Sequence, residues 1–319
     1  MKLSVKTILI LAALVLPLCF IGCDGEDEGG FDIVTSVFLP CDFAKTIAGE
    51  RANVTQLLPP GAEGHGWEPT PKALRTVASA DLFIYVGGGG DSWAEALLSS
   101  ADVSDAIAAG RLRVLCLYDS LDLSPYYDAE EQGEDHAHDV DTHFWTSPRL
   151  AKTLAESIAA AIIECEPDGA ELYRANRDAL LSELDRLDAA FGELAGADGK
   201  LYFGDKFAFY YLCHEYGIDY LSPYAGCGEN ALPIDRVVVQ MKEEVRERRV
   251  AIIFCEEYNS SSALSASIAA ESGAVVRELH SCHNLNKSDS DASLGYVTLM
   301  ERNLELIKEA LGVSADGTE

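Results

Sequence analysis

Four histidines stand where a chain of alternating strands and helices would bring side chains together. His65 lies in GAEGHGWEPTP, after an apolar run that ends near Leu58, and His143 lies in DVDTHFWTSP, just before a long helical stretch. His280 and His283 lie in ELHSCHN, directly after another strand-like run. Taken singly, each is more often an ordinary surface or hydrogen-bonded histidine. Because neutral imidazole is the commonest zinc ligand, their joint placement predicts a transition-metal site supplied by both halves of the chain.

Short apolar runs alternate with amphipathic runs in both halves of the chain. Continuous apolar runs such as VAIIF are typical of strands in a parallel sheet that helices cover on both faces. Strands are expected over residues 32–39, 53–58, 82–87, 112–118, 200–203, 219–221, 250–255 and 275–279. Helices are expected over residues 42–48, 71–78, 93–99, 207–216, 233–247, 262–272 and 294–311.

The N-terminus has the features of an export signal. Lys2 and Lys6 precede an apolar run over 7–20 that is short for a membrane span. Gly22 then precedes Cys23, which is the lipobox pattern of bacterial lipoproteins and implies cleavage before Cys23 and lipid attachment to its sulfur. A plain signal peptide with an incidental cysteine is the alternative. The acidic, glycine-rich residues that follow are expected to form a flexible tether.

A long helical region separates the two halves. A helix is expected over 148–164, an interruption at Pro167, and a second helix over 170–194, where apolar residues recur at helical spacing. The predicted fold class is α/β, with two lobes that are each a parallel sheet flanked by helices, joined by a long rigid helix. The predicted boundaries are 1–22 (signal peptide), 23–31 (lipidated tether), 32–148 (N-terminal lobe), 149–198 (linking helices), 199–312 (C-terminal lobe) and 313–319 (tail).

The charge balance is strongly acidic. Acidic residues number 53 against 24 basic ones, for a formal net charge of −29. Nucleic-acid binding needs a basic face, so we expect no nucleic-acid partner. The acidity otherwise indicates a soluble domain, which we expect to be a monomer.

Three sequence blocks point to a known family. LLPPGAEGHGWEPTPKAL, ADLFIYVGGGGDSWAEALL and DTHFWTSPRLA resemble the zinc/manganese-type solute-binding lipoproteins of ABC importers. The resemblance extends over nearly all of residues 32–312. It implies a metal site between two lobes, with His65 and His143 as ligands, and an ABC permease as partner. Zinc-type members also carry a histidine-rich loop, but here it holds only His136 and His138 and is equally well explained as a solvated loop.

The second half departs from the family pattern. The resemblance places a third histidine after the first strand of this half, where Gly204 stands, and a carboxylate after the last strand, where we assign His280. A four-coordinate site therefore needs another donor. Glu229 is our first candidate, with Asp205 and Glu256 as alternatives. The predicted metal ligands are His65, His143, His280 and Glu229.

The nine cysteines include no CxxC pair, so a cysteine-built zinc site is not expected. Cys19 leaves with the signal peptide and Cys23 is lipidated, so an odd number remain and at least one lacks an intramolecular partner. Some family members carry a disulfide in this lobe, and the resemblance implies a bridge between Cys227 and Cys282. Two free thiols, or a Cys282 thiolate on the metal, are the alternatives.

The predicted function is capture of a divalent metal outside the cell membrane. Nitrogen-rich donors favour Zn²⁺, with Mn²⁺ possible. The protein would hold the ion between its lobes, stay attached to the membrane by its lipid, and deliver the ion to an ABC importer. No enzyme activity is expected, since the sequence holds no HExxH helix and no evident Ser–His–Asp arrangement. The alternatives are a zinc-dependent hydrolase, using a metal-bound water at the position vacated at Gly204, and a surface adhesin or metal-store protein of the same fold.

Overall fold

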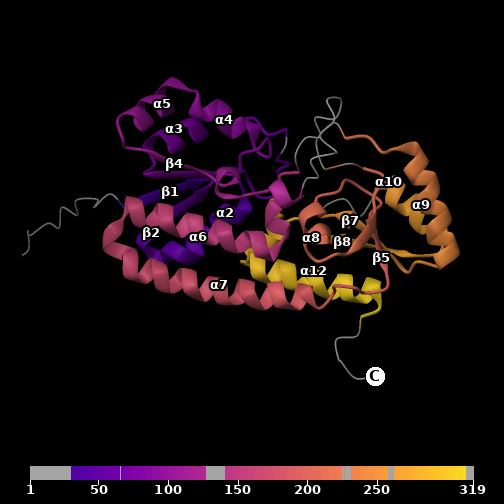
Figure 1. The fold of residues 1–319 in the computed structure, drawn as a ribbon. Helices are drawn as coiled ribbons and strands as arrows, with labels where there is room; N and C mark the ends of the chain where they lie inside the picture. The colour runs from indigo at the N-terminus through magenta and orange to yellow at the C-terminus, as the bar shows by residue number, and fades with distance from the viewer. Residues whose placement is uncertain are drawn as a thin grey trace, which may run out of the picture. The chain divides into compact units, whose positions relative to one another are not determined.

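The structure is a computed structural model of the chain. It describes residues 30–64, 66–126, 141–224, 226, 231–257 and 262–313. From Phe31 onward the chain forms one compact unit (Figure 1). Within the described residues no helix combines the length and the apolar character that a membrane span needs. The predicted signal peptide and Cys23 lie outside the described residues.

The first half is built on a parallel sheet of four strands in the order β2-β1-β3-β4. Strand β1 is central, pairing with β2 from Phe31 opposite Ala52 and with β3 from Ile33 opposite Leu82. Its inner residues are apolar and buried, which a strand covered on both faces requires. The strands are β1 (Phe31–Thr35), β2 (Ala52–Gln56), β3 (Leu82–Tyr85) and β4 (Arg113–Cys116).

Helices cover both faces of this sheet (Figure 1). One face carries α3 (Pro71–Ser79), α4 (Ser92–Leu98) and α5 (Ala101–Ala108), and the other carries α2 (Phe38–Ala48) and α6 (Pro148–Cys165). The start of α3 is fixed by its own sequence. Thr70 caps it by accepting a hydrogen bond from the Ala73 amide, and Pro71 occupies the first turn, where its missing N–H is harmless.

The second half repeats the scheme with two pairs of parallel strands instead of one four-stranded sheet. Pairs β5-β6 and β7-β8 are both parallel, and a single bridge between Phe203 and Phe254 joins them. The Gly204 amide reinforces this junction by donating to the Phe254 carbonyl at 2.8 Å. The strands are β5 (Lys200–Tyr202), β6 (Asp219–Leu221), β7 (Ile252–Glu256) and β8 (Val275–Leu279), and the helices are α8 (Tyr210–Glu215), α9 (Asp235–Arg248), α10 (Ala263–Ala269), α11 (Lys287–Asp291) and α12 (Tyr296–Leu311).

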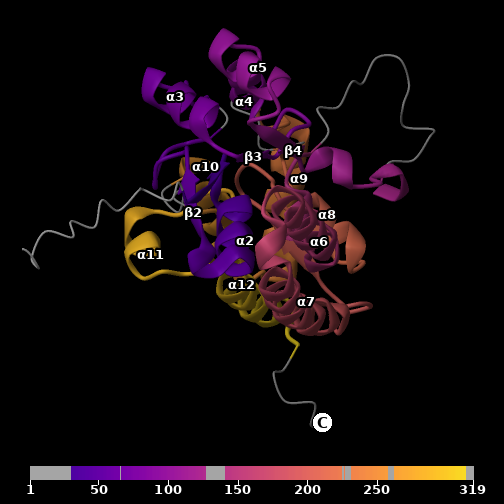
Figure 2. The same ribbon diagram turned by 90° about the vertical axis from the view of Figure 1, so that its left-hand side faces the viewer.

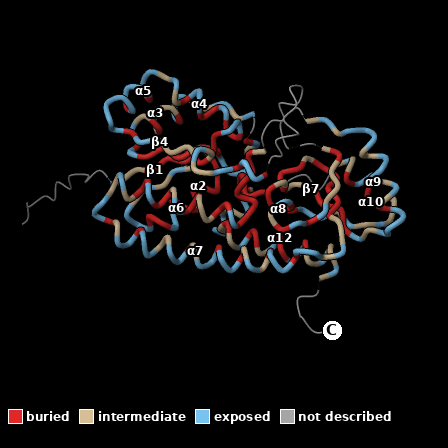
Figure 3. Tube along the Cα trace, viewed as in Figure 1, coloured by how far each residue is buried: buried red, intermediate tan, exposed pale blue. Residues whose placement is uncertain are grey.

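A helical layer underlies both halves. After the turn η5 (Pro167–Gly169), helix α7 (Ala170–Gly192) packs against α2, α6 and α12. Figure 1 and the rotated view in Figure 2 both show α12 lying beside α7. The buried positions of α7 recur at helical spacing, and Figure 3 shows the outer side of this helix exposed. The shared layer explains why the two halves form one unit.

The structure confirms the predicted α/β class, with parallel sheets flanked by helices. The strand predicted over 32–39 is wrong beyond Thr35, because α2 begins at Phe38 and continues the same apolar run as a buried helix. A short apolar run does not by itself distinguish a strand from a helix. Helices α5 and α11 were not predicted, and the lobe boundaries stay a prediction.

Candidate metal centre

His143 is fully buried at the point where the chain enters helix α6. It caps the turn η4 (Phe144–Thr146), and its carbonyl accepts hydrogen bonds from the amide and hydroxyl of Thr146 at 2.9 and 2.8 Å. The ring packs against the indole of Trp145, with centroids 5.2 Å apart. Ring and backbone are therefore both held in place by residues of the same turn.

Asp141 fixes which nitrogen of His143 can bind a metal. Its Oδ1 accepts from the His143 amide and lies 2.9 Å from Nδ1 of the same residue. An ionised carboxylate can only accept, so Nδ1 carries the proton and Nε2 is the nitrogen that bears the lone pair. This carboxylate–histidine arrangement is the usual support of a histidine that binds a metal through Nε2.

His283 is the histidine of the second half that faces His143. Their ring centroids lie 5.5 Å apart at 78°. The His283 ring also lies against Gly64, where an added Cβ would come within 2.6 Å of Cε1 and Nε2. Its carbonyl accepts from the Phe38 amide in the first turn of α2 at 3.1 Å. Gly64 directly precedes His65, which lies outside the described residues.

His280 adopts the opposite tautomer. Its Nδ1 accepts a hydrogen bond from the Cys282 amide at 2.9 Å, so in the neutral ring the proton sits on Nε2. Its backbone is held on both sides by Asn303, which accepts from the His280 amide and donates to its carbonyl, each at 2.8 Å. A protonated Nε2 is a donor and has no lone pair for a metal.

The carboxylate of Glu256, in the second half, is influenced by the charges of Glu257, His143 and Asp205. Asp205 is buried between the β5–β7 junction and α8, and Glu256 ends strand β7. Burial first, and then the charge of Glu257, raises the pKa of Glu256 above its usual range, an effect that Asp205 adds to and His143 opposes. Glu256 therefore lies within electrostatic reach of both Asp205 and His143, in surroundings that disfavour a second negative charge.

No side chain fits at Gly204, where the family resemblance places a histidine. A Cβ there would lie 2.8 Å from Cα and 2.9 Å from Oγ of Ser265, and 3.0 Å from Cγ2 of Ile253. The buried Ser265 hydroxyl donates to the Gly204 carbonyl at 2.9 Å. Helix α10 thus fills the space that a side chain at this position would need.

The loop that leads to His65 is tied to the same segment as His283. The Asn284 amide donates to the carbonyls of Pro59 and Ala62 at 2.8 and 2.9 Å, and its oxygen accepts from Gln56 at 2.9 Å. The Trp93 indole donates to the Gly64 carbonyl at 3.1 Å. Asn284 could not be recognised from the sequence, since an amide five residues after a predicted strand end has no distinguishing pattern.

Cys282 is the described half of the predicted disulfide with Cys227, which stays a prediction. It is a free thiol, fully buried, whose Sγ donates to the His280 carbonyl at 3.8 Å. Its backbone is in the left-handed region, with φ of 59°, which turns the side chain into the core beside Tyr296. The predicted partner Cys227 and the predicted ligand Glu229 lie outside the described residues.

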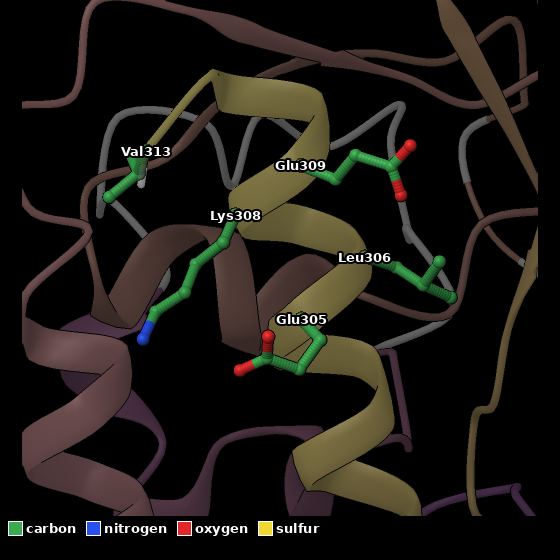
Figure 4. A pocket seen from close by; sticks show the side chains of 5 residues that line it. All are labelled: Glu305, Leu306, Lys308, Glu309 and Val313. Atoms are coloured by element: carbon green, nitrogen blue, oxygen red, sulfur yellow. The ribbon is translucent and has the colours of Figure 1, made fainter. Parts of the chain in front are cut away.

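Within the part of the chain that the structure describes, no three His, Cys, Asp or Glu side chains are grouped to hold a metal ion. A complete centre would therefore need His65 or another residue outside that part. A hollow of about 310 Å³ lies elsewhere, along the last turns of α12 (Figure 4). It contains none of the predicted donors, being lined by Glu305, Leu306, Lys308, Glu309 and Val313.

The family model described as zinc-uptake complex component A, periplasmic (ZnuA), matches residues 33–310. The chain belongs to this family. The match confirms the resemblance to metal-type solute-binding proteins, and it covers nearly the whole of both α/β halves.

Two relatives and one solved structure show which members of the ZnuA family this chain is similar to. The high-affinity zinc uptake system protein ZnuA of Bacillus subtilis is 30% identical over 291 residues, covering 89% of this chain and 88% of that protein. The zinc-binding lipoprotein AdcA of Streptococcus pneumoniae is 30% identical over 312 residues, covering 95% of this chain but 61% of that protein. The crystal structure of the Zn(II)-bound ZnuA-like domain of pneumococcal AdcA has a TM-score of 0.71 and 29% identity, covering 89% of this chain and 99% of that domain.

Proposed function

We propose that this chain captures Zn²⁺ outside the cell membrane and delivers it to an ABC importer. The observation that carries the proposal is the pair His143 and His283, whose rings face each other from the two halves of the chain. The names of the relatives support zinc as the ion. Family membership supports a transport component and not an enzyme.

The proposed ligands are His65, His143 and His283, with a carboxylate as the fourth. His65 is proposed because it directly follows Gly64, which lies against the His283 ring. His283 replaces His280 of the sequence prediction, because His280 uses Nδ1 as an acceptor while His283 faces His143. The three imidazoles and one carboxylate suit a four-coordinate zinc ion.

Asp205 is the carboxylate we favour. It is buried, its charge raises the pKa of Glu256 while that of His143 lowers it, and it follows directly on Gly204, the position that carries no side chain. Zinc would offset the negative charge that Asp205 and Glu256 concentrate there. Glu256 remains an alternative donor, as does Glu229.

Export and attachment complete the proposal. Cleavage before Cys23 and lipidation of its sulfur would hold a monomer at the outer face of the membrane, within reach of a permease. The lipoprotein name of the pneumococcal relative supports this anchor. Palmitate labelling should be lost in Cys23→Ser, and labelling that persists in that variant would exclude this cysteine as the anchor.

Titration calorimetry on metal-free protein tests the central proposal. Zinc should bind with one-to-one stoichiometry, and binding should weaken as the pH falls, since a protonated histidine cannot ligate. His143→Ala should lower the affinity at least tenfold, because a direct ligand should matter more than the supporting groups for which such losses are known. A wild-type protein that takes up no zinc would refute the function.

A further inference from the structure

Asp91 holds the glycine turn that follows strand β3. The residue is only 1% exposed, and its carboxylate accepts hydrogen bonds from the amides of Val86 and Gly87, each at 2.8 Å. The Gly90 amide donates to the Gly87 carbonyl at 3.1 Å and closes the turn. Because a buried polar group whose hydrogen bonds are made rigidifies the chain around it, the position of Gly90 is fixed.

Gly90 lies against Thr142, the residue before His143. A Cβ at position 90 would lie 2.6 Å from Oγ1 and 2.9 Å from Cβ of Thr142, both shorter than any ordinary contact of a Cβ atom. The three glycines before Gly90 have positive φ, but Gly90 does not, so its backbone conformation would admit an alanine. Lack of space therefore excludes a side chain here.

Thr142 lies between two chain neighbours that are held in place. It is 6% exposed, and His143 is fully buried. The Asp141 carbonyl accepts a hydrogen bond from the Tyr211 hydroxyl at 2.7 Å, and Oδ1 of Asp141 accepts from the His143 amide at 2.9 Å. Because a close-packed interior transmits strain, a displacement of Thr142 must disturb the peptide that joins it to His143.

We propose that Gly90 is a positioning residue, whose missing side chain lets Thr142 pack against the glycine turn and thereby holds the backbone and ring of His143. The inference rests on the proposed function, in which His143 is a zinc ligand. It gives a role to the GGGG motif, which contributes none of the proposed ligands. A ligand that is held near its bound geometry before the ion arrives binds more tightly.

Gly90→Ala tests the contact, and Thr142→Gly tests its cause. In metal-free Gly90→Ala, the His143 amide should exchange its hydrogen faster than in wild type, because its bond to Asp141 is disturbed. The zinc Kd should rise about tenfold, at the lower end of the effect of losing a supporting group. In a Thr142→Gly background, where the clashing side chain is gone, Gly90→Ala should have no further effect on either quantity.

Gly169→Ala is the matched control for crowding elsewhere. A Cβ at position 169 would lie 2.4 Å from Cζ of Tyr173 and 2.5 Å from Oε2 of Glu166, in the turn η5, which holds none of the proposed ligands. The variant should lower the stability of the protein in denaturant titrations. Its zinc Kd and the exchange of its His143 amide should stay near those of wild type.

The outcomes separate the inference from the function on which it rests. Unchanged exchange at His143 in Gly90→Ala would overturn the inference, as would a full effect of Gly90→Ala in the Thr142→Gly background. If Gly90→Ala did not fold, a folded double variant would support the inference and an unfolded one would overturn it. A wild-type protein that binds no zinc would refute the proposed function, while the exchange data would still show whether the glycine turn holds His143.

Discussion

The imidazole rings of His143 and His283 meet edge to face, with centroids 5.5 Å apart and planes at 78°. One ring enters from the start of α6 and the other from the loop after β8. The indole of Trp145 lies close to both, with centroids 5.2 and 6.0 Å away, and its Nε1 donates to the Ser281 carbonyl at 2.7 Å. The same tryptophan therefore packs against both histidines and ties their two segments together.

Alanine variants of the two neighbouring histidines should separate their roles. His283→Ala should weaken zinc binding at least tenfold in titration calorimetry, because it removes a proposed ligand. His280→Ala should leave the zinc affinity near that of wild type and lower the unfolding free energy by about 1 kcal/mol, through loss of the bond from the Cys282 amide. The reverse result would restore His280 as the ligand that the sequence predicts.

Adding a methyl group at Gly204 should strain the packing of α10. A Cβ would lie 2.8 Å from the Ser265 backbone, so Gly204→Ala should lower the unfolding free energy by about 1–3 kcal/mol in denaturant titrations. Gly192→Ala is the control, since nothing lies within 4 Å of a Cβ there and its stability should be equal or higher. If the two variants had equal unfolding free energies, a glycine at position 204 would not be sterically required.

The loop before His65 should depend on Asn284. Asn284→Asp replaces the donor group that faces the Pro59 and Ala62 carbonyls by a charged acceptor, so both bonds are lost. We expect the unfolding free energy to fall by about 2–3 kcal/mol, with weaker zinc binding at the loop's end. Asn53→Ala removes an exposed bond to Asp32 and should change stability by no more than about 0.5 kcal/mol. If Asn284→Asp left the unfolding free energy unchanged, other contacts would hold the loop.

Asp188 should make stability depend on acid pH. Burial raises the pKa of its carboxyl group, but hydrogen bonds from Lys152, Arg149 and Tyr216 outweigh burial and lower it below 3.8. A group with a lowered folded pKa stabilises above its unfolded value and loses that contribution as the pH falls through the folded value. Asp188→Asn should therefore be less stable than wild type at pH 7, and the difference should vanish on acidification.

Asp185 is the control for that experiment. It pairs with the same Lys152 at 2.9 Å, but its side chain is 67% exposed. An exposed pair contributes little, so Asp185→Asn should behave like wild type at every pH, in denaturant titrations run in parallel. If Asp188→Asn were still less stable than wild type below the folded pKa of Asp188, lost packing and not lost charge would explain the difference in unfolding free energy.

Cys282 should behave as a buried thiol. Burial raises its pKa well above the usual value for cysteine, so it should resist alkylation in the native protein. After unfolding without reductant it should be fully alkylated, as peptide mapping by mass spectrometry can show. A peptide linked to Cys227 would instead establish the bridge that the family resemblance implies.

Much of the fold could be predicted because local patterns and tertiary packing agree in it. The strands over 219–221 and 275–279 have the predicted bounds, and the break at Pro167 separates two helices as expected. The start of α2 could not be predicted, since the apolar run from Phe31 suits a strand or a buried helix until the pairing with β2 ends at Thr35. Contacts far apart in the chain decided that boundary.

The sequence by itself determined which groups are available to bind a metal, because the residue type fixes what a side chain can bind. It supplied histidines next to predicted strands and helices, a strongly acidic composition, Gly204 in place of a donor, and an N-terminal lipobox pattern. Only the tertiary structure gave grounds for proposing His283 instead of His280 as a ligand. That choice rests on which ring nitrogen a backbone amide occupies and on which ring reaches across to His143, and neither follows from spacing along the chain.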